Sequence, residues 1–270
     1  MSTPEAAART VVDRIARGGP TLVALSGGVD SGLVAALAFE ALGAGAVAAT
    51  IESSAVSAAE RDRARAVARR IGIRHVAIVA DPIDRPEYRA NPPDRCYHCR
   101  AVETGALVAW GRAEGIRQYL DGVHRDDLAD DRPGLRAMNE AGFLHPLLWA
   151  DWGKTEVRAV ARARGLPNWD QPSDACLASR VAPGEPISPE LLRRIETAES
   201  VVAAHGFRRV RVRVRGGAAR VEVDPDDVAR LTADPTAAAI VAGVRAAGFE
   251  SVTLDPRGYG QRPPALRVVP

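Results

Sequence analysis

The chain has 270 residues, of which 46% are hydrophobic and 26% are charged. This composition excludes a wholly disordered protein, and the length suits one large α/β domain or a main domain with a smaller one. The net charge of +2, from 36 basic and 34 acidic residues, is too balanced for a protein whose main task is to coat a polyanion. We therefore expect no stable nucleic-acid partner.

Hydropathy also argues against a membrane protein. No window approaches the ~20 uninterrupted apolar residues of a spanning helix. Residues 1–18 follow a helical pattern that carries Glu5 and Asp13, and they lack the apolar core of a signal peptide. We therefore expect a cytoplasmic protein that does not contact the membrane.

The first part of the chain alternates between strand and helix patterns. Apolar runs predict strands at 21–25, 46–51, 75–79 and 118–121, with a candidate fifth strand at 144–148. Helical patterns occupy 32–42, 57–71, 102–114 and 154–164. Ser57, followed three residues later by Glu60, predicts a capping box at the start of one helix. The alternation predicts an α/β fold with a parallel sheet and right-handed crossovers.

The pattern changes after Arg180, where Pro183-Gly-Glu-Pro186 is typical of a linker. Beyond it we expect a helix over 188–205 and a hairpin whose strands, 209–215 and 220–223, flank Gly216-Gly217. Two short helices, 225–231 and 236–247, and a strand at 251–254 complete the pattern. The sequence thus predicts a main domain over 1–182, a smaller C-terminal α+β domain over 186–262 and a tail over 263–270.

A glycine-rich turn, Ser26-Gly-Gly-Val-Asp-Ser31, follows the first predicted strand and opens a helix. Gly27 and Gly28 let backbone N–H groups approach an anion, the helix N-terminus favours negative charge, and both serines add hydroxyl donors. Asp30 would repel a bare phosphate, so it orients the loop or holds Mg²⁺. The turn lacks the lysine of the G-x-x-x-x-G-K-[ST] loop. An ordinary tight turn is the plainer alternative, but the serines and Asp30 favour phosphate binding.

This turn is similar to the pyrophosphate loop (PP-loop) of the ATP pyrophosphatases, which include GMP synthetase, NAD synthetase and the tRNA thiolases. The resemblance implies a Rossmann-like sheet that binds ATP, cleaves it between the α and β phosphates and turns the substrate into an adenylate. It also implies that Thr50 and residues 52–54 lie near the adenosine.

Three aspartates, Asp121, Asp126 and Asp127, follow the fourth predicted strand. Carboxylates at the carboxyl ends of strands near a phosphate loop commonly bind Mg²⁺ or ribose. We expect Asp121 and Asp127 to contact the nucleotide; the alternative is a solvated acidic turn.

The three cysteines are too few and too odd in number for a disulfide scaffold. Cys96 and Cys99 form a C-x-x-C pair, and Cys176 lies far along the chain. Three thiolates suit an iron–sulfur cluster with one open iron, or a zinc site completed by His98. A redox pair beside a separate nucleophile, Cys176, is a third interpretation, and incidental cysteines are the plainest one.

Six segments, in order along most of the chain, resemble the LarE family of ATP-dependent sulfur transferases. They are SGGVDS (26–31), TIESSAVS (50–57), NPPDRCYHCR (91–100), DGVHRDDLADDRPG (121–134), LPNWDQPSDACLASR (166–180) and the RVRVR hairpin (209–223). The family adenylates a carboxylate of pyridinium-3,5-biscarboxylic acid mononucleotide and converts it to a thiocarboxylate. The product leads to the nickel-pincer nucleotide cofactor of lactate racemase.

The resemblance implies one of two sulfur sources. In some members a single cysteine, matching Cys176, forms a thioester and gives up its sulfur. In others three cysteines, matching Cys96, Cys99 and Cys176, hold a 4Fe-4S cluster with an extra sulfide on the open iron. The three cysteines favour the cluster version. The chain departs from the family at His124, where asparagine is expected, and at Arg100, where lysine is usual.

Basic residues near Cys176 and in the hairpin are candidates for binding the small nucleotide substrate. Ser179 and Arg180 follow Cys176 and could grip its phosphate or AMP; the start of a helix is the alternative. Arginines at 209, 211, 213 and 215 alternate with valines, which predicts a charged face on an exposed edge strand. Because the substrate carries two carboxylates and a phosphate, we expect Arg211 and Arg213 to bind it and Glu222 to orient them. Glu196 and Glu199 are expected to be solvated.

Two other functions compete with sulfur transfer to a small molecule. A tRNA thiolase also combines this loop with a C-x-x-C pair and a distant cysteine, but the balanced charge argues against it. A non-catalytic ATP sensor, or an adaptor stabilised by zinc, would use the same residues without chemistry. Relatives of this kind form homo-oligomers, so we expect self-association.

Overall fold

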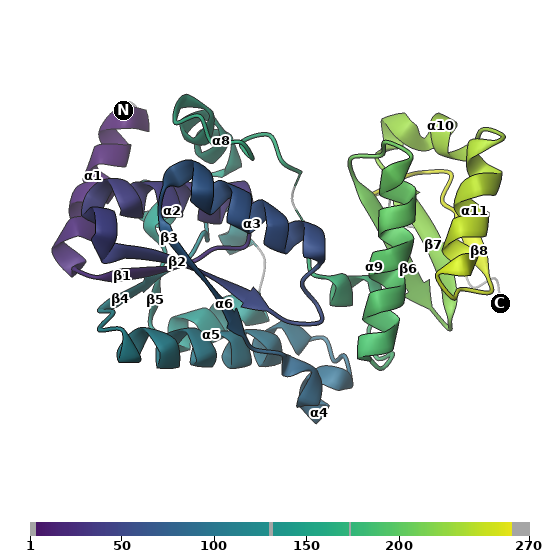
Figure 1. Ribbon diagram of the computed structural model, residues 1–270, viewed down its shortest axis with the longest axis horizontal. Coiled ribbons are helices and arrows are strands. Elements are labelled where there is room, and N and C mark those ends of the chain that lie inside the picture. Colours follow the sequence, from purple (N-terminus) through teal and green to yellow (C-terminus); the bar gives the residue numbers. More distant parts are fainter. Residues whose placement is uncertain (1–3, 130–131, 173, 261–270) are drawn as a thin grey trace. The chain divides into compact units, whose positions relative to one another are not determined.

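The computed structural model describes residues 4–129, 132–172 and 174–260 and divides into two compact units, Met1–Ala175 and Cys176–Pro270 (Figure 1). The division falls earlier than the predicted boundary after residue 182. Its cause is that Arg180 pairs with Glu199 and Val181 forms a bridge with Val214, which ties this segment to the second unit. The predicted tail, 263–270, lies outside the described residues.

The first unit is built on a five-stranded parallel sheet, which confirms the predicted fold class. The strands are β1 (Thr21–Ala24), β2 (Ala46–Glu52), β3 (Arg74–Val79), β4 (Gln118–Leu120) and β5 (Phe143–Leu144). Their order is β3-β2-β1-β4-β5, and each neighbouring pair runs parallel. Strands added after β1 lie on opposite sides of it, so its carboxyl end is the switch point where open α/β sheets bind ligands.

Helices cover both faces of this sheet (Figure 1). Leu22 and Val23 are neighbours in β1 and point to opposite faces. Val23 packs in a core with α1 (Pro4–Gly18), α2 (Val29–Leu42), α3 (Ala58–Ile71) and α8 (Lys154–Ala163). Leu22 packs in a second core with α5 (Arg95–Ala113) and α6 (Pro133–Glu140). Two covered faces explain why the strands appear in the sequence as unbroken apolar runs.

Local boundaries follow capping residues and prolines. The predicted capping box holds, because Ser57 Oγ accepts from the Glu60 N–H and Glu60 accepts from the Ser57 N–H. The fifth strand was predicted too long: it ends at Leu144 because Pro146 opens the short helix α7 (Pro146–Trp149). Helix α5 starts at Arg95 instead of 102, after the short helix α4 (Pro86–Arg89). None of the described helices is both long and apolar enough to cross a membrane.

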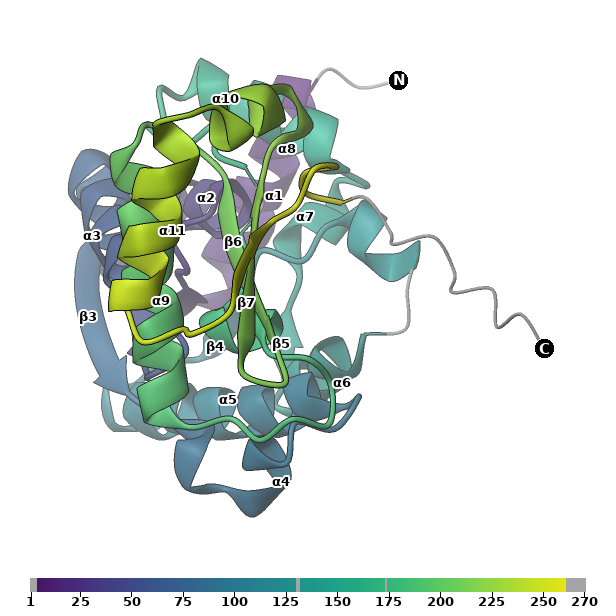
Figure 2. The ribbon, with the colours of Figure 1, turned by 90° about the vertical axis from the view of Figure 1, so that its right-hand side faces the viewer.

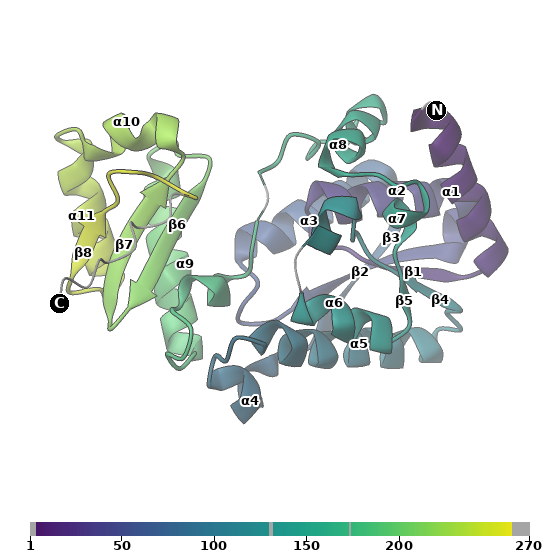
Figure 3. The ribbon, with the colours of Figure 1, turned by 180° about the vertical axis from the view of Figure 1, so that it is seen from behind.

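The second unit has the predicted α+β composition. Its helices are α9 (Pro189–Ala204), α10 (Val228–Thr232) and α11 (Thr236–Ala246), and its strands are β6 (Val210–Arg215), β7 (Ala218–Val223) and β8 (Val252–Leu254). The strands lie in the order β6-β7-β8; β6 and β7 are antiparallel, and β8 runs parallel to β7. Figure 2 shows α9 and α11 along one face of this sheet, and Figure 3 shows the opposite face.

The exit of β1 is fixed to β2 and β3 just before the glycine-rich turn. The Leu25 N–H donates to Ala49 O at 2.8 Å, and the Thr50 hydroxyl donates to Leu25 O at 2.7 Å. His75 Nε2 lies 2.8 Å from the same hydroxyl. Because that hydroxyl's proton is already used, the imidazole N–H is the donor. Burial, and then the charges of Arg65 and Arg69, lower the pKa of His75.

The lowered pKa of His75 predicts a pH-dependent stability. Between the folded-state pKa and its ordinary value of 6.5, the unfolded chain binds more protons than the folded one, so stability rises with pH. The free energy of unfolding should therefore fall as the pH is lowered through this window. In His75→Gln, urea unfolding should lose this slope, whereas the exposed His205→Gln should keep it. An unchanged slope in His75→Gln would contradict the assignment.

Gly122, just beyond β4, lies close against the start of α2. A Cβ at this position would lie 2.5 Å from Ser31 N and 2.8 Å from the Asp30 carbonyl carbon. Backbone atoms cannot move aside as a flexible side chain can. The missing side chain therefore sets how closely β4 and the turn after β1 approach each other.

We predict that Gly122→Ala destabilises the first unit by about 1–3 kcal/mol, because it overpacks backbone against backbone. The matched control is Gly105→Ala in α5, where an added Cβ meets nothing within 4 Å and helix propensity should raise stability by roughly 0.5–1 kcal/mol. Thermal unfolding followed by circular dichroism measures both. Equal melting temperatures for the parent and Gly122→Ala would refute the close approach.

Candidate functional site

The turn between β1 and α2 has a shape that only glycine allows. Gly27 has φ of +84°, and a Cβ there would lie 2.8 Å from Ala64 N and 3.0 Å from Glu60 O of α3. Gly28 is the N-cap of α2 and has no side chain, so the N–H groups of the first helical turn make no hydrogen bond to a side chain of their N-cap residue. The Gly28 N–H itself donates to Ser26 Oγ at 3.3 Å. These donors and the positive end of the helix dipole favour an anion at the mouth of the turn.

The two serines of the turn differ in exposure and in task. Ser31 is buried, and its Oγ accepts from the Ser26 N–H at 3.1 Å. The two hydroxyl oxygens lie 3.0 Å apart, and Ser26 is exposed. Ser31 thus closes the turn from inside, while the hydroxyl oxygen of the exposed Ser26 also accepts from the Gly28 N–H at 3.3 Å.

Asp30 is neutralised by the only lysine in the chain. Lys154 Nζ lies 2.7 and 2.6 Å from the two carboxylate oxygens of Asp30, and both side chains are 24% exposed. The ammonium group comes from the first residue of α8, far from the turn in sequence. Sequence reasoning did not select Lys154, although its uniqueness among arginines was a usable signal.

Asn168 is a second residue that sequence reasoning did not select. Its amide donates to Gly27 O at 2.9 Å, and its Oδ1 is buried with no hydrogen-bond partner among the described residues. The residue lies in the LPNWD segment, which was noticed only as a family motif. Its contact fixes the carbonyl of Gly27, and its amide also lies close to Gly32 of α2.

Asp121 lies at the end of β4 and is tied down on one oxygen only. Its Oδ1 accepts from the Val123 N–H at 3.0 Å and lies 2.8 Å from His145 Nδ1. Its Oδ2 is buried without a hydrogen-bond partner in the described part of the chain. A buried carboxylate oxygen without a donor is costly, which suits a group that meets a ligand.

His124 connects the segment after β4 to the turn after β1. Its Nε2 lies 3.9 Å from Asp30 and 3.6 Å from Asp127. Asp127 accepts from the His124 N–H at 3.1 Å and pairs with Arg132 at 2.5 Å. The backbone N–H of Lys154 donates to Asp126 and lowers the pKa of that exposed carboxyl. The structure thus places Asp30, Asp121 and Asp127 at the carboxyl edge of the sheet, where the turn also lies.

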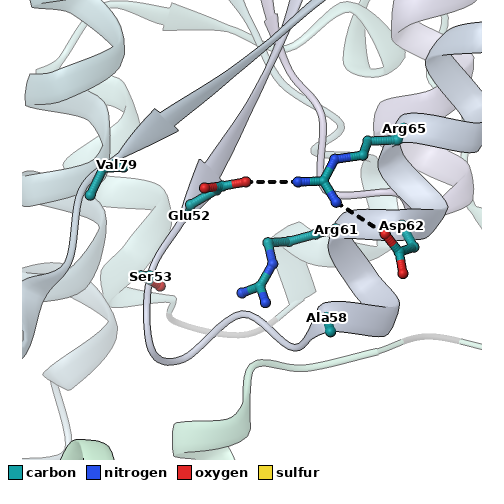
Figure 4. A pocket seen from close by; sticks show the side chains of 7 residues that line it. All are labelled: Glu52, Ser53, Ala58, Arg61, Asp62, Arg65 and Val79. Carbon is teal, nitrogen blue, oxygen red and sulfur yellow. Dashed lines mark hydrogen bonds and ion pairs between the residues drawn. The ribbon is translucent and has the colours of Figure 1, made fainter.

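The segment after β2 is less open to a ligand than its sequence indicates. The hydroxyl of Thr50 is buried and used to hold Leu25 and His75. Glu52 pairs with Arg65 of α3 at 2.9 Å. Beside this pair is an open hollow of about 500 Å³ that Ser53 also lines, together with Arg61 (Figure 4).

Cys96 and Cys99 both lie in the first turns of α5. Cys96 is exposed and Cys99 half-buried. Cys99 Sγ donates to Glu103 at 3.4 Å, and the same carboxylate accepts from Arg100 at 2.8 Å. Glu103 is buried. Both thiols therefore sit on one helix end, with Cys96 the more accessible.

Cys176 begins the second unit, just before a short 3₁₀ helix (Leu177–Arg180). Arg180 is buried and forms a bidentate pair with Glu199 at 2.8 and 2.9 Å. Its Nη1 also donates to Cys176 O and to Ser179 Oγ, each at 3.0 Å. Glu199, expected to be solvated, is instead the anchor of this arginine, and it also accepts from the Val212 N–H.

The hairpin arginines join the same network. Arg213 donates to Ser179 O at 3.0 Å and to Glu222 at 3.1 Å. The prediction of an exposed arginine face is wrong for Arg211, which is 5% exposed, because neighbouring side chains cover it. Arg215 at the strand end is exposed. The second unit therefore links Cys176, Ser179, Arg180, Arg213 and Glu222 through direct contacts.

Within the described residues no group of three or more His, Cys, Asp or Glu side chains is arranged to hold a metal ion. His98, the candidate fourth zinc ligand, lies 3.6 Å from Asp94 instead. None of the three cysteines forms a disulfide; two of them lie in α5 and one in the second unit.

Comparison with known proteins agrees with this geometry. The asparagine synthase family profile matches residues 4–98, which contain the turn and the first three strands. The uncharacterized protein slr1717 of Synechocystis sp. is 40% identical over 238 residues, covering 88% of this chain and 89% of that protein. A glutamine-hydrolyzing GMP synthase chain of Methanosphaerula palustris is 30% identical over 166 residues, covering 54% of this chain and 50% of that protein.

A third relative fixes the family. The pyridinium-3,5-bisthiocarboxylic acid mononucleotide synthase of Lactiplantibacillus plantarum is 31% identical over 238 residues, and the match covers 88% of this chain and 86% of that synthase. This match extends through both units. The chain therefore belongs to the LarE family, within the ATP pyrophosphatases.

Proposed function

We propose that this protein is an ATP-dependent sulfur transferase that converts a carboxylate of pyridinium-3,5-biscarboxylic acid mononucleotide to a thiocarboxylate, in nickel-pincer nucleotide cofactor biosynthesis. One observation carries the proposal: a glycine turn that opens a helix, and a cysteine whose backbone carbonyl accepts from Arg180 next to the hairpin arginine Arg213, occur together in one chain of this family. The first group suits ATP, and the second suits an anionic acyl substrate.

In the proposed first step, a substrate carboxylate oxygen attacks the α-phosphorus of ATP, and pyrophosphate leaves. Gly27, Gly28 and the hydroxyls of Ser26 and Ser31 would hold the departing pyrophosphate. Asp121 and Asp127, together with the phosphate oxygens of ATP, would hold Mg²⁺, whose charge compensates that of the phosphates. Asp30, paired with Lys154, would orient the turn. Thr50 would support the adenosine side from within the sheet, since its hydroxyl anchors Leu25.

In the proposed second step, a sulfur nucleophile attacks the acyl carbon of the adenylate, and AMP leaves with the bonding electrons. Arg211 and Arg213 would bind the anionic groups of the substrate, with Glu222 orienting Arg213. Ser179 and Arg180 would support the site without binding the substrate directly. Because Arg180 is buried against Glu199, its role is to hold Cys176 and Ser179 in place.

For the sulfur source we propose a 4Fe-4S cluster held by Cys96, Cys99 and Cys176. Three thiols, of which Cys96 is exposed, support a cluster that keeps one iron open. When bound, such a cluster supplies a sulfur carrier that turns over without consuming the chain. The alternative is a sacrificial Cys176, which would leave dehydroalanine after one turnover.

Iron and acid-labile sulfide in anaerobically reconstituted protein separate the two sources. The cluster source predicts about four iron atoms per chain and visible absorption, and both should be lost in Cys96→Ala and in Cys176→Ala. Cys96→Ala should then fail to form thiocarboxylate. An iron-free parent that makes product once, and whose mass falls by one hydrogen sulfide, would contradict the cluster and favour sacrifice of Cys176.

Lys154→Met tests the first step. Without the ammonium group, the Asp30 carboxylate faces the triphosphate unneutralised, so we expect the Kd for a non-hydrolysable ATP analogue to rise by about tenfold or more. Lys154→Arg keeps the charge and should recover much of the affinity. Calorimetric titration measures all three proteins, and equal affinities for the parent and Lys154→Met would contradict this role.

A further inference from the structure

A buried amide side chain lies against the glycine-rich turn over residues 26–31. Asn168 is 6% exposed, and its Nδ2 donates to Gly27 O at 2.9 Å. Its Oδ1 is buried and has no hydrogen-bond partner in the described part of the chain. Burying an amide oxygen without a donor costs free energy, which a leucine of similar volume would avoid. The residue type at this position is therefore explained by its N–H donor and not by packing.

Gly32 of α2 leaves room for this amide. A Cβ at Gly32 would lie 3.1 Å from Asn168 Nδ2 and 3.3 Å from Val67 Cγ1. Glycine within a helix is less favourable than alanine, so the chain gives up helix stability at this position. The residues at 32 and 168 are thus both unfavourable by themselves, and both serve the hydrogen bond to Gly27.

The main chain at Asn168 is held by the end of α8 and by the core. The Leu166 N–H donates to Ala161 O at 3.0 Å, and the Gln171 N–H donates to Asn168 O at 3.1 Å. Leu166 is buried in the core that contains residues of α2 and α8, and Trp169 packs against the same core. The amide therefore reaches the turn from a fixed backbone.

The hydrogen bond from Asn168 sets the direction of one peptide unit of the turn. The carbonyl of Gly27 and the N–H of Gly28 belong to the same planar unit and point in opposite directions. Because neither glycine has a side chain, this unit rotates at little steric cost unless a partner holds it. Asn168 holds the carbonyl, so the N–H points the other way, to Oγ of the exposed Ser26 at 3.3 Å. That bond is long, so a charged oxygen can share the donor.

We propose that Asn168 is a positioning residue that fixes the Gly27–Gly28 peptide unit with its N–H ready for an oxygen of pyrophosphate. The proposal rests on the proposed function and adds to it the residue that prepares the turn before the ligand arrives. If the unit were turned over, a carbonyl oxygen would take the place of the N–H and repel the anion. Holding the unit in advance removes the cost of ordering it on binding.

Asn168→Leu tests the proposal because it removes the donor and keeps the volume. Calorimetry of the full-length protein with Mg²⁺ and inorganic pyrophosphate should give an affinity about tenfold or more below that of the parent, since a hydrogen bond to a charged group is lost. The affinity for AMP should not change. In protein with isotope-labelled glycine, the Gly28 N–H resonance should move on addition of pyrophosphate in the parent and stay in place in Asn168→Leu.

Gly32→Ala tests the same hydrogen bond from the helix side. The added methyl group displaces the amide, so pyrophosphate affinity should fall although alanine favours the helix. In Asn168→Ala the space is free, so adding Gly32→Ala should cost no further affinity. Gly105→Ala of α5, where an added Cβ meets nothing within 4 Å, is the matched control and should bind pyrophosphate as the parent does.

Three results would overturn the proposal: pyrophosphate affinity in Asn168→Leu equal to that of the parent, equal losses for pyrophosphate and AMP, or losses that add in the double variant. If Asn168→Leu melts below the assay temperature, Gly32→Ala replaces it, because alanine raises helix propensity. A parent protein that binds pyrophosphate through Gly28 but shows no substrate-dependent exchange of pyrophosphate into ATP would contradict the proposed function and leave the role of Asn168 intact.

Discussion

The backbone N–H groups at the start of α2 are the constraint on which the first unit depends. Their N-cap residue, Gly28, has no side chain to cap them, so the first turn of the helix offers N–H donors at the switch point of the sheet. Thr50 fixes the carbonyl just before the turn, Asn168 fixes the carbonyl of Gly27, and Gly122 lets β4 approach. Lys154 balances the one carboxylate inside the turn. Each of these contacts supports the shape of the turn from beside or behind it.

In the second unit, arginine side chains hold the segment that contains Cys176. The buried pair of Arg180 and Glu199 is costly to desolvate, so its presence is weak evidence for a stabilising role. Here the pair fixes the backbone carbonyl of Cys176 and the hydroxyl of Ser179. Arg213 then joins Ser179 to the hairpin. Charge-assisted hydrogen bonds thus hold the main chain at Cys176 and the side chain of Ser179.

Much of the fold could be predicted from the sequence, because two covered sheet faces produce apolar runs and helix caps mark boundaries. The fifth strand could not, since two strand residues followed by Pro146 look like a longer apolar run. The roles of Lys154 and Asn168 could not be predicted for another reason. Their contacts with the turn join residues more than a hundred positions apart, and no local sequence pattern encodes such pairing. Arg211 is buried although the sequence predicts an exposed side chain. The alternation of residues shows which face of a strand a side chain is on, but not what covers that face.

The central claim is that the turn over residues 26–31 binds the pyrophosphate released when a carboxylate is adenylated. Isotope exchange tests it most directly: labelled pyrophosphate or labelled phosphate is incubated with ATP, the full-length protein and the dicarboxylate mononucleotide. The account predicts that label from pyrophosphate enters ATP only when the carboxylate substrate is present, and that label from phosphate does not enter. Formation of ADP, or entry of label from phosphate, would show cleavage between the β and γ phosphates and contradict the account.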